Sequence, residues 1–428
     1  MKYYKEIFAL SIPNILSNIS IPLISSVDTG LMGHLSAKHL AAVGSSAMIF
    51  NFLYWNFGFL RMGTTGLVAQ AHGRKDEHEK SRSFLQAVLV ALSIAALLLL
   101  LQKPLASISF QLMNLDGELL KYAKDYFSVR IWDAPGTLLL YILMAWFFGN
   151  QNAIVPLILT IIINVTNIAF SYYFVKVLGL GIQGVAYGTL ISTYTGIIVG
   201  FIFLFKKHPV ISIPFSELSS GLQRFWKLNR DIFLRTVMLS ITFAFLYSMA
   251  ARYGTIALAI NVIVLQFTNW MSYAVDGFAY ASESLVGKYV GAKDDHAVKK
   301  TINGSMICGA ILALLFSIIY ALFYREIAQI FTSDLEVLVQ LRQYRWWLVI
   351  IPLVGFASYI WDGVFVGLTA SKAMRNTMAV SFVVYLATYF LTEDYLGYSA
   401  LLLALCMYLL SRGIAQTVVY LQKGTALQ

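Results

Sequence analysis

Five charged side chains lie inside long apolar stretches of the sequence: Asp28, Arg61, Asp276, Glu283 and Asp362. A charge at the centre of a membrane span costs about 2.5 to 3.5 kcal/mol on insertion scales, so such a residue pairs, faces a water-filled cavity or serves transport. Carboxylates in this setting can bind protons or cations. They are therefore the first candidates for a functional site.

Asp28 lies near one end of the first apolar stretch, in the segment Ser-Ser-Val-Asp-Thr-Gly-Leu-Met-Gly-His of residues 25–34. Pro13 and Pro22 precede it, and each removes a backbone hydrogen bond, so a helix here can bend. A carboxyl group in a poorly hydrated pocket can bind and release a proton as its hydration changes. Alternatively, Asp28 only caps the helix end or bonds a neighbouring hydroxyl group, and the residues leave both interpretations open.

Uncharged polar residues recur at helical spacing in two later apolar stretches. The fifth stretch carries Asn164, Asn167 and Ser171, and the sixth carries Thr189. Hydroxyl and amide groups at this spacing often only connect neighbouring helices. If one polar stripe instead faces Asp28, it provides oxygen ligands or relay partners for a proton or a cation.

The composition shows which elements must position these groups. Of 428 residues, 59% are hydrophobic and 12% are charged, whereas soluble proteins carry about 25% charged residues. Continuous apolar runs of about 20 residues predict membrane-spanning helices, while a β-barrel would show short alternating segments. We expect an all-α integral membrane protein with twelve spans, at residues 8–33, 45–71, 84–104, 122–148, 154–177, 184–206, 232–252, 257–288, 303–324, 340–368, 375–392 and 397–421.

The formal net charge is +10, and the positions of the Lys and Arg residues are more informative than this sum. They concentrate in the connections on one side of the predicted spans, which by the positive-inside rule is the cytoplasmic side and holds both termini. This count places Arg235 and Arg412 on the cytoplasmic side and leaves Arg61 within a span. The bias explains the basic character without nucleic-acid binding, and Cys308 and Cys406 are expected to be packing residues.

The longest polar connection, between Lys206 and Arg230, divides the chain into an N-terminal lobe of six helices (1–207), a cytoplasmic linker (208–230) and a C-terminal lobe of six helices (231–428). The two halves repeat at an offset of 218 residues, clearest where residues 66–78 match residues 284–296. An even number of spans per half predicts a pseudo-two-fold axis along the membrane normal, with a cavity between the lobes where transporters hold substrate.

The remaining candidates are assigned to the substrate cavity or to gating. Asp276 and Glu283 are seven residues apart on one helix and so share a face, while Asp362 lies in the tenth span. At the 218-residue offset Arg61 and Asp276 lie at similar depth on equivalent helices. We hypothesise that they pair across the cavity in one state. Alternatively, each is satisfied within its own bundle.

No pattern in the sequence indicates catalysis. The glycine-containing segment 66–73 lacks the Gly-Lys-Ser/Thr ending of an ATP-binding loop. His72 and His78 have no carboxylate or thiol partners at metal-ligand spacing. We therefore expect a protein that is not an enzyme and that binds neither a metal nor an organic cofactor.

Three segments resemble the multidrug and toxic compound extrusion (MATE) family, in particular its DinF-type branch. They are residues 27–34 with Leu-Ala-Ala-Val at 40–43, Phe-Leu-Arg-Met-Gly-Thr-Thr-Gly-Leu-Val-Ala-Gln at 59–70, and Tyr-Ala-Val-Asp-Gly-Phe-Ala-Tyr-Ala-Ser-Glu at 273–283. The resemblance covers essentially the whole chain. It implies a two-lobed exporter of twelve helices that exchanges protons or sodium ions for lipophilic, often cationic, drugs.

The resemblance also implies roles for individual residues. Asp28 matches the proton-responsive acid of the family's first helix, and Pro13 matches its proline, with Asn167 and Thr189 as the acid's partners. Ser171 stands where relatives often carry a second carboxylate, which weakens the case for sodium. In the C-terminal half, Asp362 matches a tenth-helix acid, and no seventh-helix glutamate is evident.

We accordingly expect a proton-coupled, or alternatively sodium-coupled, multidrug antiporter of the bacterial inner membrane. It is expected to be a monomer that takes up small lipophilic or cationic substrates and contacts membrane lipid. The alternative is a flippase for lipids or lipid-linked precursors, which requires several cationic residues in the cavity. With Arg61 as the only deeply placed cation, the sequence favours the exporter.

Overall fold

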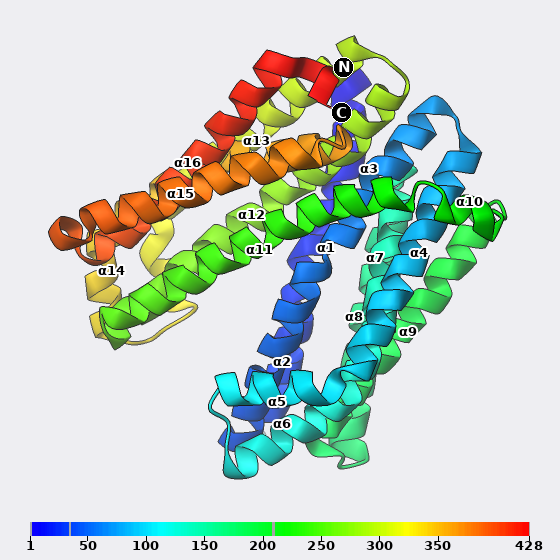
Figure 1. Ribbon diagram of the computed structural model, residues 1–428. Coiled ribbons are helices and arrows are strands. Elements are labelled where there is room, and N and C mark those ends of the chain that lie inside the picture. Colours follow the sequence, from blue (N-terminus) through cyan, green and yellow to red (C-terminus); the bar gives the residue numbers. More distant parts are fainter. Residues whose placement is uncertain (1, 34–35, 208–209, 428) are drawn as a thin grey trace. The chain divides into compact units, whose positions relative to one another are not determined.

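The structure is a computed structural model that describes residues 2–33, 36–207 and 210–427. These residues form helices joined by short turns, and no strand occurs among them (Figure 1). In chain order the helices are α1 (Lys2–Gly33), α2 (Ala37–Phe57), α3 (Phe59–Arg74), α4 (Glu77–Leu100), α5 (Gln102–Leu112), α6 (Gly117–Arg130), η1 (Ile131–Asp133), α7 (Ala134–Gly149), α8 (Ile154–Tyr172), η2 (Tyr173–Val177), α9 (Gly181–Lys207), α10 (Phe215–Ser219), α11 (Leu222–Arg252), α12 (Thr255–Gly291), α13 (Asp295–Gln329), α14 (Leu335–Gly367), α15 (Ser371–Leu396), α16 (Tyr398–Lys423) and η3 (Gly424–Leu427).

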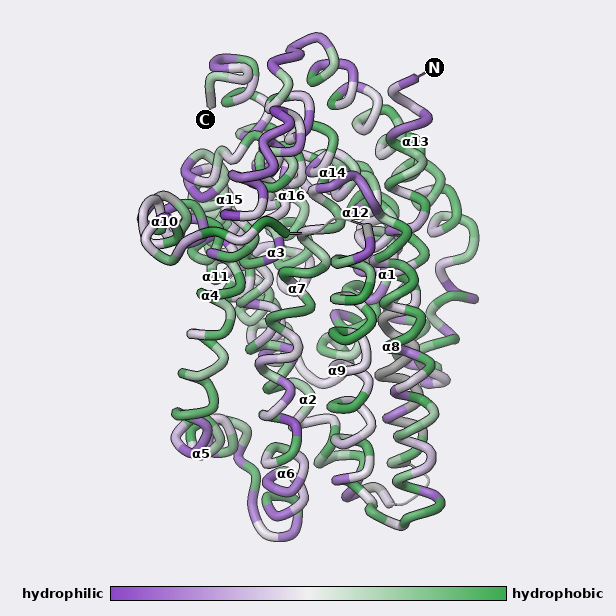
Figure 2. Tube along the Cα trace, turned by 90° about the vertical axis from the view of Figure 1, so that its right-hand side faces the viewer, coloured by the Kyte–Doolittle hydropathy of each residue, from purple (hydrophilic) through white to green (hydrophobic). Residues whose placement is uncertain are grey.

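Within the described ranges, nine helical segments are long and apolar enough to cross a membrane. They coincide with nine of the twelve expected spans. The other three, at residues 8–33, 45–71 and 375–392, lie in α1, in the consecutive helices α2 and α3, and in α15. Figure 2 shows hydrophobic residues along much of the length of the long helices.

The outer surface of α13 has the character of a lipid-facing helix. Its exposed residues include Ile307, Ile311, Leu314, Ile318 and Leu322, each at least 49% exposed. Their spacing of three or four residues places them on one side of the helix. A continuous apolar stripe of this kind is unfavourable in water and is typical of a helix in contact with lipid.

The contacts divide the chain into two compact units. Unit 1 comprises residues 1–15 and 226–428, and unit 2 comprises residues 16–225. One division falls inside α1, two residues after Pro13, and the other falls inside α11. The first fifteen residues thus pack with the C-terminal half, where Glu6 accepts a hydrogen bond from Lys288 Nζ at 3.3 Å.

Each unit is a bundle held by close helix contacts. In unit 2, α7 packs on α3, α4 and α9, while α8 packs along α9 and α6 packs on α2 and α9. In unit 1, α14 packs on α12, α13, α15 and α16. Helices α7 and α14 are therefore central to their own bundles, and the candidate Asp362 on α14 is held by neighbours on several sides.

The repeat seen in the sequence is built into the turns of both units. Lys75 follows α3 and Lys293 follows the C-terminal end of α12, both in the left-handed conformation, with φ of 58° and 59°. The next residue then starts a helix, because Asp76 Oδ1 accepts from Glu79 N and Asp294 Oδ1 accepts from Ala297 N, both at 2.9 Å. An N-terminal aspartate cap satisfies an otherwise unpaired backbone donor.

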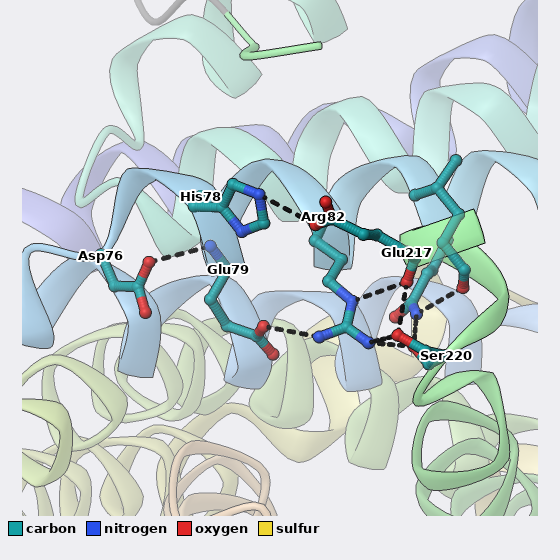
Figure 3. A network of polar contacts seen from close by, with 8 residues as sticks. Asp76, His78, Glu79, Arg82, Glu217 and Ser220 are labelled. Carbon is teal, nitrogen blue, oxygen red and sulfur yellow. Dashed lines mark hydrogen bonds and ion pairs between the residues drawn. The ribbon is translucent and has the colours of Figure 1, made fainter. Parts of the chain in front are cut away.

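The linker before α11 is held on α4 of unit 2 (Figure 3). Arg82 Nε donates to the Glu217 carbonyl oxygen at 3.1 Å, and Arg82 Nη2 donates to Ser220 Oγ at 2.9 Å. One turn further along α4, Gln86 Nε2 donates to the Leu218 carbonyl oxygen at 2.9 Å. His78 lies 3.2 Å from a Glu217 carboxylate oxygen. These bonds fix α10 and the following turn to one unit.

Candidate functional site

Asp28 is a buried residue of α1 in the part that belongs to unit 2. Asp28 is 9% exposed, and its Oδ1 atom has no hydrogen-bond partner within the described part of the chain. The groups that act on this carboxyl are the Ser171 hydroxyl, the Asn167 amide and the Arg130 guanidinium. The expected acid and amide are therefore near each other, together with Ser171 and Arg130. Thr189, the hydroxyl that the resemblance assigned to Asp28, instead accepts a hydrogen bond from Asn167.

The partners of Asp28 are themselves positioned by contacts between α8 and α9. Asn167 Nδ2 donates to Thr189 Oγ1 at 3.0 Å, and both Asn167 and Ser171 are fully buried. Gly188 of α9 lies against Ser171, where a side chain would collide with the serine backbone. Among the described residues, Asn167 Oδ1 is left without a hydrogen-bond partner. Buried oxygen atoms without partners are costly, so a further hydrogen-bond donor at this atom would be stabilising.

Asn164 lies one turn from Asn167 and bonds the first helix directly. Its Nδ2 donates to the Ser20 carbonyl oxygen at 3.1 Å, and on the same side Ser17 Oγ donates to Thr160 Oγ1 at 3.2 Å. The two bonds connect α8 to the portion of α1 that precedes Asp28. Asn164 therefore contacts α1 at Ser20, in the part of the helix that precedes Asp28.

A second buried acid lies beyond Arg130, at the junction of α6 and α7. Asp133 is fully buried, and its Oδ2 accepts hydrogen bonds from Arg130 Nη1 and, at 2.7 Å, from Thr137 Oγ1. In the sequence these two charges lie three residues apart near one end of the fourth expected span, at residues 122–148. Their spacing of three residues was the available signal that they pair.

Arg61 and Pro13 lie where helices were expected. Arg61 is half-buried on α3, with its guanidinium carbon 6.0 Å from the centroid of the Phe148 ring. Pro13 is half-buried inside α1, which continues through it. In unit 1, Asp276 is half-buried and Glu283 is 1% exposed on the same helix, α12. Arg61 and Asp276 belong to different units, and their pairing stays a prediction.

Asp362 is surrounded by arginines within unit 1. Its Oδ2 accepts from Arg235 Nη2 of α11 and from Arg412 Nη2 of α16, and its Oδ1 accepts from Gln416 Nε2 at 2.9 Å. The two arginine residues are 7% and 2% exposed. The sequence had counted Arg235 and Arg412 with the cytoplasmic side and Arg61 as the only deeply placed cation, whereas the structure buries both arginines within unit 1. The side of the membrane on which they lie stays a prediction. Both guanidinium groups are retained inside because a buried carboxylate pairs with them.

The repeat places aromatic residues where unit 2 has its polar pocket. At the 218-residue offset, Asn167 and Ser171 correspond to Tyr385 and Tyr389, which are both buried. The ring of Phe245 packs edge-on against both tyrosines, with centroids 5.7 and 5.2 Å away. The corresponding part of unit 1 is thus filled by rings. The acid-and-amide pocket is a feature of unit 2.

Within the residues that the structure describes, no group of three or more His, Cys, Asp or Glu side chains could hold a metal ion.

Comparison with known proteins identifies the family to which the chain belongs. The model of the MatE family matches the chain twice, over residues 13–173 and 232–391. The chain belongs to the MatE family. The two matches start 219 residues apart and end 218 residues apart, so the internal repeat is the family's own repeat.

Individual MatE relatives are similar to this chain over most of its length. DNA damage-inducible protein F of Escherichia coli is 34% identical over 97% of this chain and 92% of its own length. Human multidrug and toxin extrusion protein 1 is 25% identical over 78% of this chain and 59% of its own length. A crystal structure of a MATE protein in the bent conformation matches the whole chain and 96% of its own length, with a TM-score of 0.90 at 20% identity.

These similarities confirm the family, its DinF-type branch and the all-α, two-lobed membrane fold that the sequence predicted. This MatE protein is a multi-pass membrane transporter and not an enzyme.

Proposed function

We propose that this MatE protein is a proton-coupled antiporter that exports small lipophilic or cationic compounds. The observation that carries the proposal is the buried Asp28 carboxyl beside Asn167 and Ser171, with Asp28 Oδ1 and Asn167 Oδ1 lacking hydrogen-bond partners among the described residues. A carboxyl in such a pocket can exchange a proton for an organic cation. Relatives named as multidrug resistance and extrusion proteins support the substrate class.

In the proposed cycle, protonation of Asp28 from outside releases the substrate and bends α1 near Pro13. Loss of the proton to the cytoplasm restores the charged form that attracts a cation. Proline removes one backbone hydrogen bond from α1 and so reduces the cost of bending there. The two ends of α1 belong to different units, so a bend in this helix is well suited to changing the protein's conformation.

Protons are favoured over sodium as the coupling ion because the pocket offers Asp28 as its carboxylate and otherwise neutral oxygen atoms. Ser171 occupies the position at which a second carboxylate would help to compensate the charge of a metal cation.

The second candidate, a flippase for lipids or lipid-linked precursors, is favoured by one observation. Two buried arginines converge in unit 1, which is the kind of cationic cluster that a phosphate group requires. Both, however, donate to Asp362, so their hydrogen-bonding capacity is already partly used. The exporter remains the preferred function.

The test is transport by purified protein in proteoliposomes under separately imposed pH and sodium gradients, with a panel of cationic dyes. We expect efflux driven by the pH gradient and lost in Asp28→Asn. Asp116→Asn is the matched control, because Asp116 is exposed and its side chain does not cap α6. Retention of proton coupling in Asp28→Asn, or flipping of a fluorescent lipid with no dye efflux, contradicts the proposal.

We further propose that the protein works as a monomer in the bacterial inner membrane, with both termini in the cytoplasm and lipid around its apolar surface. The charge bias of its connections supports this orientation. Labelling of single cysteines introduced near Lys2 and Lys423, with a reagent that does not cross membranes, tests it.

A further inference from the structure

Helix α5 leaves the direction of the membrane spans directly after α4. Helix α4 has 24 residues, which at about 1.5 Å per residue extend over roughly 36 Å and are long enough to cross a hydrocarbon core of about 30 Å. The chain turns at Leu101, and α5 then runs across the direction of α4 (Figure 1), so that Figure 2 shows it along its own axis. A helix that begins where a span ends and lies across it is at the level of the lipid headgroups.

One side of α5 is apolar and largely exposed. Its residues are Leu101, Leu105, Ile108 and Leu112, and all of them except Leu105 are exposed. Residues spaced three or four apart share one side of a helix. A helix in the membrane interface buries such a side among the acyl chains. The opposite side of α5, which carries Lys103, then remains at the depth of the headgroups.

This opposite side of α5 and the facing side of α6 line a cavity of about 440 Å³. The ring of Phe110 from α5 packs edge-on against the ring of Phe127 from α6, with centroids 5.7 Å apart, and both residues are buried. Lys103 of α5 and Lys124 of α6 line the same cavity. The lining therefore combines aromatic rings with two cationic groups, one from each helix.

The protein itself does not neutralise the two lysines. Among the described residues, neither Lys103 nor Lys124 forms a hydrogen bond or an ion pair, and no carboxylate lines the cavity. The acids of α6 lie on another side of the helix: Glu118 pairs with Lys38, and Asp125 follows Glu118 at a spacing of seven residues. Like charges at one cavity repel each other, and an anion bound beside both removes this cost.

We propose that the cavity between α5 and α6 binds the phosphate group of an anionic phospholipid from the leaflet in which α5 lies. Lys103 and Lys124 donate hydrogen bonds to the phosphate oxygens, and the Ser107 hydroxyl of the same lining is a further donor. Phe110 and Phe127 contact the glycerol carbons and the first methylene groups of the acyl chains. This site lies outside the candidate transport pocket, and the inference does not depend on the proposed transport.

The depth of the cavity favours a lipid over a free phosphate ion. Lipid phosphates are concentrated at this level of the membrane, and the exposed leucine and isoleucine side chains hold α5 there. Basic pockets between membrane helices can bind anionic headgroups in this way. The two buried rings also offer a surface for hydrocarbon, which a lipid can use and a free phosphate ion cannot.

The test is photocrosslinking of the purified full-length protein in detergent micelles that contain a trace of phosphatidylglycerol with a photoactivatable group near the start of one acyl chain. Peptide mass spectrometry locates the cross-links, and we expect them in residues 102–128. Unlabelled phosphatidylglycerol should displace the probe at a lower mole fraction than phosphatidylcholine, and inorganic phosphate in the buffer should not displace it. Equal displacement by the two lipids, or displacement by inorganic phosphate, would overturn the assignment.

Removal of the two cavity charges should weaken binding of the lipid. In the double variant Lys103→Gln with Lys124→Gln, we expect half-displacement to require an about thirtyfold higher mole fraction of phosphatidylglycerol, since each lysine near an anionic lipid contributes about fivefold. The matched control is Lys121→Gln with Lys176→Gln, which removes two exposed lysines that do not line the cavity. Equal weakening in the control would show that overall charge, and not the cavity, attracts the lipid.

Two further variants separate the space in the cavity from its charges. Ala106 lines the cavity, and Ala106→Phe places a ring there while both lysines stay, so we expect the cross-links in residues 102–128 to be lost. Lys103→Arg with Lys124→Arg keeps both charges and should retain them. Because both lysines are exposed, their variants should fold and decide the question if Ala106→Phe does not. Unchanged cross-linking in Ala106→Phe or in the double glutamine variant, or its loss in the double arginine variant, contradicts the inference.

Discussion

Gly188 of α9 lies against Ser171 of α8 at a distance that leaves no space for a side chain. A Cβ atom on Gly188 would lie 2.3 Å from Ser171 Oγ and 2.7 Å from its backbone nitrogen. A backbone atom cannot move aside without moving its helix. The close approach of these two helices is therefore what brings Thr189 within hydrogen-bonding distance of Asn167.

We expect Gly188→Ala to destabilise the protein by about 1 to 3 kcal/mol, as overpacking of a well-packed interior does, and to impair transport by moving α8 away from α9. The measurement is thermal unfolding in detergent together with dye efflux. Gly44→Ala is the control, because Gly44 lies within α2 and a Cβ there would meet no atom within 4 Å. An alanine at position 188 without effect on either readout would show that the helices can separate at no cost.

Ser171→Asp restores a second carboxylate beside Asp28. Two neighbouring carboxylates cannot both ionise easily, so one binds its proton more tightly and the pair attracts metal cations more strongly. We expect the pH optimum of efflux to move to the alkaline side and a response to a sodium gradient to appear. Ser171→Asn has the same size without the charge and should show neither change. Equal behaviour of the two variants would mean that the added charge is irrelevant.

The arginine cluster of unit 1 predicts an order of stabilities. Asp362→Asn leaves two buried guanidinium groups without their carboxylate, and we expect a loss of about 3 to 5 kcal/mol. Arg412→Met leaves a balanced pair of Arg235 and Asp362, so its loss should be smaller. Chemical unfolding of the two variants under identical detergent conditions gives the comparison. The reverse order would show that Asp362 is not the charge that holds the cluster together.

Arg82 holds the linker on α4, so its removal should loosen the linker without affecting the rest of the protein. Arg82→Ala removes the bonds to Glu217 and Ser220 that Figure 3 shows, and we expect faster hydrogen exchange and faster proteolysis across residues 210–221. Arg74→Ala removes the same charge at an exposed position nearby and should leave the linker unchanged. Unaltered exchange in Arg82→Ala would mean that Gln86 and the remaining contacts suffice.

The sequence predicted most reliably those features in which the residue type itself determines the local structure. The Lys-Asp pairs at 75–76 and 293–294 recur because the same turn and the same aspartate cap are needed twice. Asp28 was found because an acid in an apolar helix requires an explanation, and the expected Asn167 and Ser171 do lie beside it.

The arginines were missed because hydropathy and charge counts treat each span alone. Arg235 lies well inside α11, which begins at Leu222, and Arg412 was inside its own predicted span. The four-residue spacing of Arg412 and Gln416 on the last helix was a signal that they share a face. Which carboxylate they meet depends on the packing of α11, α14 and α16, and no single segment carries that information.

The chain passes between its two units within α1 and again within α11, and not in a flexible loop at either place. A loop would let each unit drift freely, whereas a hydrogen-bonded helix transmits torque along its axis. A change in the helical geometry of α1 or α11 is therefore a direct change in the stretch of chain that joins the two units.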